Sequence, residues 1–177
     1  MMRRVFILDT SKCFGCLGCV AACVHANRTP SGVLWREVLK LPPEEGSRDT
    51  LYLSLACNHC ENAPCVRACP SGALSKRSTD GVVLHDPDQC LGCRYCQMAC
   101  PYGAIRYDAS TKVTSKCQFC ADRIDEGREP ACVETCFGGA LRMEIVDSEA
   151  EPAEYRKEIP GFVHHPEAGP GIRFLRK

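Results

Sequence analysis

The chain has 177 residues, a formal net charge of zero at pH 7 and sixteen cysteines. The balanced charge excludes a nucleic acid or another polyanion as a partner selected by overall electrostatics. With one Trp, five Tyr and six Phe, aromatic packing cannot be the main source of stability. We therefore expect a group bound to the cysteines to replace part of the apolar core.

Apolar runs in the sequence are short, and the run at 5–8 is far below the roughly 18 residues that a membrane-spanning helix needs. This run follows Arg3 and Arg4 and ends at Asp9, so it is also shorter than the roughly 7–15 apolar residues of a secretory signal. We expect a soluble chain that is made in the cytoplasm and has no export signal of its own.

The predicted strands are short and most of them follow a cysteine group. In chain order we expect strands at 4–8, 74–77, 105–107 and 141–145, and an Asp-Gly turn with a returning strand at 79–86. We expect a helical turn or two around each C-x3-C and an exposed helical turn at 121–131. The joining segment 25–49 carries the only Trp, and residues 147–177 are polar and unpatterned. We expect this last segment to be mobile or to lie over a partner.

The sixteen cysteines form four groups of four, and every group ends in C-x3-C. The groups are Cys13, Cys16, Cys19 and Cys23; Cys57, Cys60, Cys65 and Cys69; Cys90, Cys93, Cys96 and Cys100; and Cys117, Cys120, Cys132 and Cys136. A Gly-Ala-aliphatic step follows the last cysteine of groups two, three and four, as in "CPSGAL" at 69–74. This regular spacing is an internal repeat.

The third group, in "CLGCRYCQMACP" at 90–101, has the full C-x2-C-x2-C-x3-C-P spacing of bacterial ferredoxins. Three cysteines in such a run bind one [4Fe–4S] cluster, and the fourth reaches the neighbouring cluster. Four zinc sites and a disulfide scaffold are the alternatives for so many cysteines. Zinc sites do not need four C-x3-C endings, and a disulfide scaffold is typical of exported proteins, so the pattern favours iron–sulfur clusters.

The connections between the groups predict how they pair. Groups two and three are joined by the hairpin at 79–86, as in a single two-cluster ferredoxin, so we expect them to exchange their fourth cysteines. Groups one and four then pair across the chain, and Ser-Lys-Cys begins both groups. The predicted ligand sets are Cys13, Cys16, Cys19 and Cys136 for cluster one; Cys57, Cys60, Cys65 and Cys100 for cluster two; Cys90, Cys93, Cys96 and Cys69 for cluster three; and Cys117, Cys120, Cys132 and Cys23 for cluster four.

The fold expected from this pairing is α+β, with two interleaved bacterial two-cluster ferredoxin-like domains of short strands, turns and short helices. Residues 1–52 with 110–146 form domain A, with an insertion at 25–49. Residues 53–109 form domain B, and residues 147–177 form an extended C-terminal tail.

Several residues near the cysteines are candidates for supporting roles. Glycines within the loops would let backbone N–H groups approach cluster sulfur, and basic side chains beside ligands would offset cluster charge or simply be solvated. Nearby aromatic rings would shield sulfur from water, and His59, between two cysteines, is expected to lie beside a cluster without binding iron. His164 and His165 could bind a metal, but solvated side chains are the preferred interpretation. The residues of the first three kinds are Gly15, Gly18 and Gly92; Lys12, Arg94 and Lys116; and Phe14, Tyr95, Tyr102, Phe119 and Phe137.

The stretch "CNHCENAPCVRACPSGALSKRSTDGVVLHDPDQCLGCRYCQMACPYGA" at 57–104 resembles the four-cluster electron-transfer subunit of dimethyl sulfoxide reductase and its polysulfide, thiosulfate and tetrathionate reductase relatives. The likeness covers residues 4 to about 145, and all sixteen cysteines fall on the family's pattern. Nitrate reductase relatives replace one ligand with Trp, which this chain does not do. Phe137 stands where a Pro is common after the last ligand, and 164–174 faintly resembles the family's C-terminal arm.

This resemblance implies a protein without substrate chemistry of its own that transfers electrons in anaerobic respiration. Its four [4Fe–4S] clusters would join a molybdopterin (Mo or W) catalytic subunit to an integral membrane anchor subunit that exchanges electrons with quinone. The chain would lie at the periphery of the cytoplasmic membrane, on the outer side if a twin-arginine partner carried it and otherwise in the cytoplasm. The alternatives are an electron-transfer subunit of a cytoplasmic formate dehydrogenase or hydrogenase, and a free-standing polyferredoxin shuttle.

Overall fold

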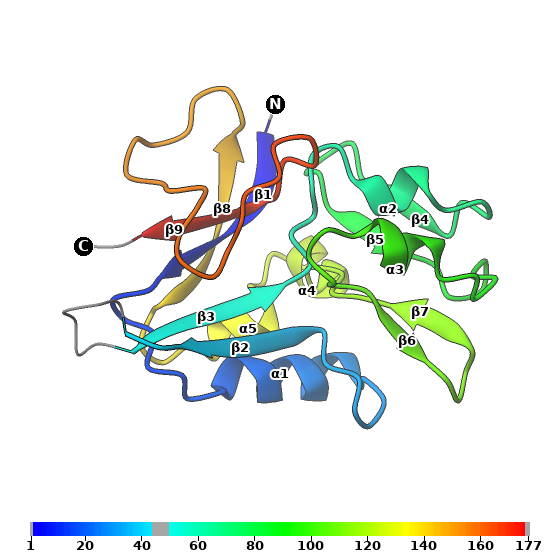
Figure 1. Cartoon of the computed structure of the whole chain (residues 1–177), viewed down its shortest axis with the longest axis horizontal. Helices are drawn as coiled ribbons and strands as arrows, with labels where there is room; N and C mark the ends of the chain where they lie inside the picture. Colours follow the sequence, from blue (N-terminus) through cyan, green and yellow to red (C-terminus); the bar gives the residue numbers. More distant parts are fainter. Residues whose placement is uncertain (1, 44–49, 176–177) are drawn as a thin grey trace.

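A central three-stranded sheet joins the two ends of the chain in the computed structural model, which describes residues 2–43 and 50–175 (Figure 1). Strand β1 (Met2–Asp9) lies between β8 (Leu141–Asp147), which is antiparallel to it, and β9 (Ile172–Leu175), which is parallel. Phe6 and Leu8 face the main core, whereas Val5 and Ile7 pack on the other side with Val146. Because both faces of β1 are covered, its apolar residues run without interruption.

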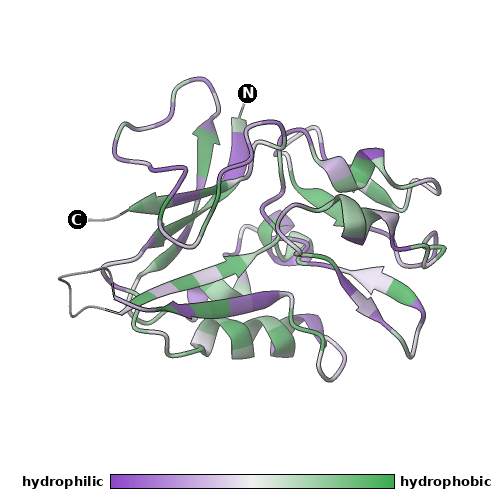
Figure 2. Ribbon diagram, in the orientation of Figure 1, coloured by the Kyte–Doolittle hydropathy of each residue, from purple (hydrophilic) through white to green (hydrophobic). Residues whose placement is uncertain are grey.

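A hairpin of β2 (Arg36–Leu41) and β3 (Leu51–Ala56) lies between the first two cysteine groups. No strand was predicted in this segment from the sequence. Along β3, leucines alternate with less hydrophobic residues, as Figure 2 shows, and this alternation is the pattern of a half-buried strand. The predicted joining segment also includes residues 44–49, which lie outside the described residues.

The helices that carry the cysteines form two packed pairs. Helix α1 (Gly18–Asn27) packs against α5 (Ala131–Glu134), and α2 (Pro64–Arg67) packs against α3 (Tyr95–Ala99). The first pair brings together cysteine groups one and four, and the second pair brings together groups two and three. Figure 1 shows these pairs in different parts of the molecule, with α4 (Ala121–Asp125) between them.

Two further hairpins accompany the second pair. Strand β4 (Leu74–Lys76) pairs with β5 (Val83–His85), as the Asp-Gly turn predicts. Strand β6 (Arg106–Asp108) pairs with β7 (Val113–Ser115), and β7 was not predicted from the sequence. The predicted α+β class of short strands and short helices is confirmed.

The prediction that the C-terminal segment is mobile or lies over a partner is wrong for its described part, because this part packs on its own chain. Strand β9 pairs with β1, and Ile172 and Phe174 are buried in the main core. The ring of Phe162 stacks on that of Tyr102 with centroids 5.2 Å apart. The segment has too few apolar residues for a core of its own, but these residues complete a core formed by other elements.

The limits of the two proposed domains fall within hairpins. Residue 52 lies in β3, and residue 110 lies in the connection between β6 and β7. Backbone hydrogen bonds of each hairpin therefore cross a limit drawn from the cysteine spacing alone. The division into two domains remains a proposal.

Candidate iron–sulfur centres

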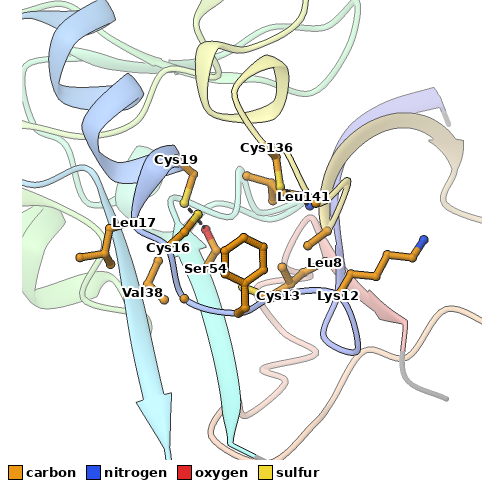
Figure 3. Close-up of a pocket in the computed structure, with 14 residues that line it drawn as sticks. Leu8, Lys12, Cys13, Cys16, Leu17, Cys19, Val38, Ser54, Cys136 and Leu141 are labelled. Atoms are coloured by element: carbon orange, nitrogen blue, oxygen red, sulfur yellow. Dashed lines mark hydrogen bonds between the residues drawn. The ribbon is translucent and has the colours of Figure 1, made fainter.

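A cavity at one end of the molecule is lined by Cys13, Cys16, Cys19 and Cys136 (Figure 3). These are the four cysteines predicted for cluster one. The first three come from the loop after β1 and the start of α1, and the fourth follows α5. The rest of the lining is largely apolar and includes Leu8, Phe14, Leu17, Val38 and Leu141. Such a lining keeps water away from sulfur.

A second pocket is lined by Cys69, Cys90, Cys93 and Cys96, the set predicted for cluster three. Thr114 lies between two of these sulfurs, with its Oγ1 3.6 Å from the Sγ of both Cys90 and Cys96. The fourth cysteine again comes from the other group of the pair.

The cysteines predicted for cluster two lie together in the interior. Burial raises the pKa of the Cys60 thiol to about 12, and the neighbouring Cys57, Cys100 and Cys65 add to the increase. The pKa of Cys65 is also raised to about 12 by burial and then by Cys57. Thiols in such surroundings stay protonated until a positively charged partner displaces the proton, so metal binding here releases protons.

The set predicted for cluster four is also brought together. Burial raises the pKa of Cys23 to about 12, and the proximity of Cys132 and Cys120 contributes to the increase. The amide nitrogen Nδ2 of Asn27 lies 3.7 Å from Cys23 Sγ and 3.9 Å from Cys120 Sγ. Burial and then Cys23 raise the pKa of Cys117 well above its ordinary value. Asn27 thus contacts sulfurs of both groups that form this set.

All sixteen cysteines are free, so the structure contradicts the disulfide alternative. Within the residues that the structure describes, no three His, Cys, Asp or Glu side chains are close enough to hold one metal ion. A cubane cluster does not require such convergence, because each of its four thiolates binds a different iron.

The loops of groups one and three share an unusual backbone conformation. Gly15 and Leu17 have φ of 73° and 63°, and Gly92 and Arg94 have φ of 66° and 65°. In each loop, two left-handed residues are separated by one cysteine. Successive N–H groups in such a loop point inward and form an anion-binding nest of the kind found at iron–sulfur sites. Each loop therefore suits the negative charge of a thiolate-bound cluster.

Gly92 is required for a second reason: a Cβ there would lie 2.1 Å from the carbonyl oxygen of Lys112. The β6–β7 connection thus approaches the group-three loop more closely than a side chain permits. Gly18, by contrast, is the first residue of α1 and does not have a positive φ.

Hydrogen bonds from the protein already reach several sulfurs. The N–H of Phe119 lies 3.4 Å from Cys117 Sγ, and the N–H of Leu141 lies 3.2 Å from Cys136 Sγ. Ser54 Oγ lies 3.2 Å from Cys19 Sγ (Figure 3). Bonds of this kind stabilise electron-rich sulfur and tune the reduction potential of a cluster.

Of the three basic residues singled out in the sequence, only Lys116 is buried, with 1% of its surface exposed. Its Nζ donates to the carbonyl oxygens of Val83 and, at 3.0 Å, Cys117. Lys12 and Arg94 are exposed. Lys116 is therefore placed to affect the interior, whereas the other two are solvated.

His59 and Phe119 lie in the interior between the two pairs of cysteine groups. Burial, reinforced by Lys116, holds the pKa of His59 well below its ordinary value of 6.5. Its Nδ1 accepts a hydrogen bond from the N–H of Val83 at 3.0 Å, so the ring proton is on Nε2. The ring of Phe119 contacts His59 edge-on and stacks on Phe6 with centroids 4.2 Å apart.

The other supporting candidates have more ordinary surroundings. Phe14, Tyr95 and Phe137 are exposed. The backbone N–H of His165 donates to Tyr102 Oη at 3.1 Å, and the His165 ring contacts the Tyr102 ring edge-on. This histidine therefore has an aromatic neighbour in the fold.

Arg36 is a buried polar residue that was not predicted from the sequence. Burial alone lowers the pKa of its guanidinium, but the ionised cysteines around it, with Cys132 the strongest, raise the pKa above its ordinary value. Its position directly after Trp35 carries no recognisable motif, and burial of an arginine cannot be read from local sequence.

Residues 48–146, more than half of the chain, match the family model described as the 4Fe-4S dicluster domain. An iron–sulfur relative from the anaerobic dimethyl sulfoxide reductase of Escherichia coli (strain K12) is 42% identical over 151 residues, covering 80% of this chain and 73% of that protein. The protein is a member of the iron–sulfur electron-transfer subunits of the dimethyl sulfoxide reductase family. The resemblance found at 57–104 is thus confirmed, as is an electron-transfer rather than a catalytic role.

Other relatives come from enzymes with different substrates. The thiosulfate reductase electron transfer subunit PhsB of Salmonella typhi is 39% identical, covering 89% of this chain and 84% of that protein. A subunit of the sulfite dehydrogenase of Allochromatium vinosum is 36% identical, covering 96% of this chain and 80% of that protein. No helix among the described residues has the length and apolar character needed to cross a membrane.

Proposed function

We propose that the chain holds four [4Fe–4S] clusters, with the crossed ligand sets that the cysteine spacing predicts, and conducts electrons between two partner subunits. One partner is a molybdopterin catalytic subunit, and the other is a membrane anchor that exchanges electrons with quinone. The clusters supply one-electron redox chemistry when bound, and the protein holds them in sequence and excludes water.

The observation that carries this proposal is the order of the four cysteine sets along the molecule. Cys19 of set one is among the charges that act on Cys132 of set four. Cys57 of set two likewise acts on Cys117 of set four. Cysteines of sets two and three pack in one apolar cluster that includes Cys65. The sets therefore follow one another in the order one, four, two, three, as an electron path requires.

The two ends of this path reach the surface, and the middle does not. Among the cysteines, Cys16 of set one and Cys93 of set three are exposed. Large apolar side chains are exposed near each end: Phe14, Leu17 and Phe137 near set one, and Leu91, Tyr95 and Met98 near set three. Exposed apolar groups of this kind are typical of protein interfaces. They support one docking surface for a partner at each end.

The remaining parts of the proposal follow from family membership. The complex would serve anaerobic respiration, and the chain would lie at the periphery of the cytoplasmic membrane. Domains A and B would each hold two clusters, with β3 assigned wholly to domain A because its hairpin is continuous.

Metal analysis of the native complex, isolated anaerobically from membranes through a tag on this chain, tests the proposal. We expect iron together with molybdenum or tungsten, and a membrane subunit. Iron with nickel would favour a hydrogenase, and molybdenum or tungsten without a membrane subunit would favour a cytoplasmic formate dehydrogenase. A monomer with full cluster content would favour a free polyferredoxin, and zinc without iron would refute cluster binding.

Substitutions at the two ends test the docking surfaces. Phe137 is 91% exposed and Leu91 is 72% exposed, so Phe137→Ser and Leu91→Ser remove little internal packing. We expect each variant to lose a different partner subunit while keeping its iron. Val163→Ser is the matched control, because Val163 is exposed on the C-terminal segment, outside both surfaces.

A further inference from the structure

Arg36 is a buried cation without a carboxylate partner among the described residues. Only 1% of its surface is exposed. Its Nη1 donates to the Oγ of Ser54 at 3.0 Å and to the Ser54 carbonyl oxygen at 3.3 Å, and its guanidinium lies 4.5 Å from the ring centre of Phe6. Its Nε and Nη2 have no hydrogen-bond partner in the described part of the chain. An isolated buried charge is very unfavourable, so a compensating negative group is expected close by.

The negative groups that act most strongly on Arg36 are cysteines. In decreasing order of effect they are Cys132, Cys117, Cys19 and Cys23. Three of them are in the proposed cluster-four set, and Cys19 is in the cluster-one set. Arg36 therefore lies at the junction of these two sets.

Ser54 connects Arg36 to cluster one. Because the Ser54 oxygen accepts a proton from Arg36 Nη1, the single hydroxyl hydrogen of Ser54 is free to point at Cys19 Sγ, 3.2 Å away. This direction of donation is the one that favours an ionised Cys19. Serine thus extends the influence of the guanidinium to a sulfur of set one.

We propose that Arg36 is the shared counter-charge of clusters one and four, with Nε and Nη2 as the donors available to cluster sulfur. This inference rests on the proposed crossed ligation. Reduction adds negative charge to a cluster, so a fixed cation and hydrogen bonds to sulfur stabilise the reduced form and raise the reduction potential. Arginine suits this role because its planar group always carries charge and has five donors.

Redox titration of the intact complex, followed by EPR, tests the role of Arg36. In Arg36→Met, which removes the charge, we expect two of the four clusters to become harder to reduce. A tenfold change in the reduction equilibrium of a one-electron centre corresponds to a shift of about 59 mV, and we expect at least that shift. Arg36→Lys retains the charge and should restore much of the potential. The signals that move should be those lost in Cys16→Ala (cluster one) and Cys120→Ala (cluster four).

Arg173→Met is the matched control for the loss of a buried arginine. Arg173 is 3% exposed and pairs with Glu151, without a cysteine among its hydrogen-bond partners in the described chain. We expect this variant to lose stability while all four potentials stay unchanged. Equal shifts in Arg36→Met and Arg173→Met would overturn the proposal, as would unchanged potentials in Arg36→Met with full iron content.

If Arg36→Met does not retain its clusters, Ser54→Ala provides the decisive measurement. It removes the bond to Cys19 and leaves the charge of Arg36 in place, so cluster one alone should become harder to reduce. An unchanged cluster-one potential would overturn the proposal. Failure of the crossed ligation itself would appear separately, in the iron content of double cysteine variants.

Discussion

The crossed ligation predicts that cysteine substitutions combine in a specific way. Cys136 follows α5 in group four, but it lines the same cavity as Cys16 of group one. Cys120, although in the same group as Cys136, lies near Cys23 instead. Removing Cys16 and Cys136 together should therefore remove one cluster, whereas removing Cys120 and Cys136 together should remove two.

Iron content gives the magnitude directly. A chain with four [4Fe–4S] clusters holds about sixteen irons, and the loss of one cluster leaves about twelve. We expect about twelve in Cys16→Ala, Cys136→Ala and their double variant. We expect about eight in the double variant of Cys120→Ala and Cys136→Ala.

The assay is iron determination on anaerobically purified protein, with EPR of the reduced samples to show which signal disappears. Cys16 is exposed, so its substitution removes little packing and is the reference for the loss of cluster one alone. The reverse pattern, about eight irons without Cys16 and Cys136 and about twelve without Cys120 and Cys136, would mean that each group binds its own cluster. That result would refute the reasoning.

Three further predictions concern the loops, the core and the C-terminal segment. Gly92→Ala should lose cluster three, since its Cβ would meet a carbonyl oxygen at 2.1 Å. Gly103→Ala, with positive φ but open space, should cost only about 1–2 kcal/mol and keep its iron, and equal iron loss in both would contradict the steric argument. Phe119→Ala removes a buried ring stacked on its neighbour at 4.2 Å, so denaturant unfolding should show a loss of about 3–5 kcal/mol; a loss below about 1 kcal/mol would contradict this packing. Burial alone raises the pKa of Glu151, but Arg173 lowers it below the ordinary 4.5, so their pair stabilises the fold above that pH and the contribution is lost as the pH falls below it. Limited proteolysis of the C-terminal segment should be faster in Glu151→Gln at pH 7, and the difference from the unsubstituted chain should shrink toward pH 4; an equal rate at pH 7 would show that the pair contributes nothing.

Short-range spacing explains why the sequence predicted so much of the candidate site. The positions of Cys90, Cys93 and Cys96 within seven residues leave one tight loop as the simplest arrangement, and the nest at Gly92 and Arg94 is part of that loop. The β4–β5 hairpin likewise follows from a local Asp-Gly turn. These features depend on neighbours in the chain, which a sequence displays directly.

Features that depend on distant segments were not predictable in the same way. Strand β9 forms because β1 has a free edge and an apolar face on which Phe174 can pack, although its own segment is polar overall. The β2–β3 hairpin crosses a polar connection that masks its alternation. Neither signal is strong enough by itself to predict a strand.

The sequence alone therefore determined the cysteine groups, their cofactor class and the family, because metal-ligand spacing is a local property. Only the tertiary structure decided which charged side chains are interior. Lys12, Arg94 and Lys116 are each next to a predicted ligand or its loop, yet only Lys116 is buried, and Arg36 lies thirteen positions beyond the nearest cysteine in sequence but is surrounded by cysteines in space. Burial is set by the elements that pack over a residue, and for Arg36 these come from β1, β3 and both halves of the α1–α5 pair.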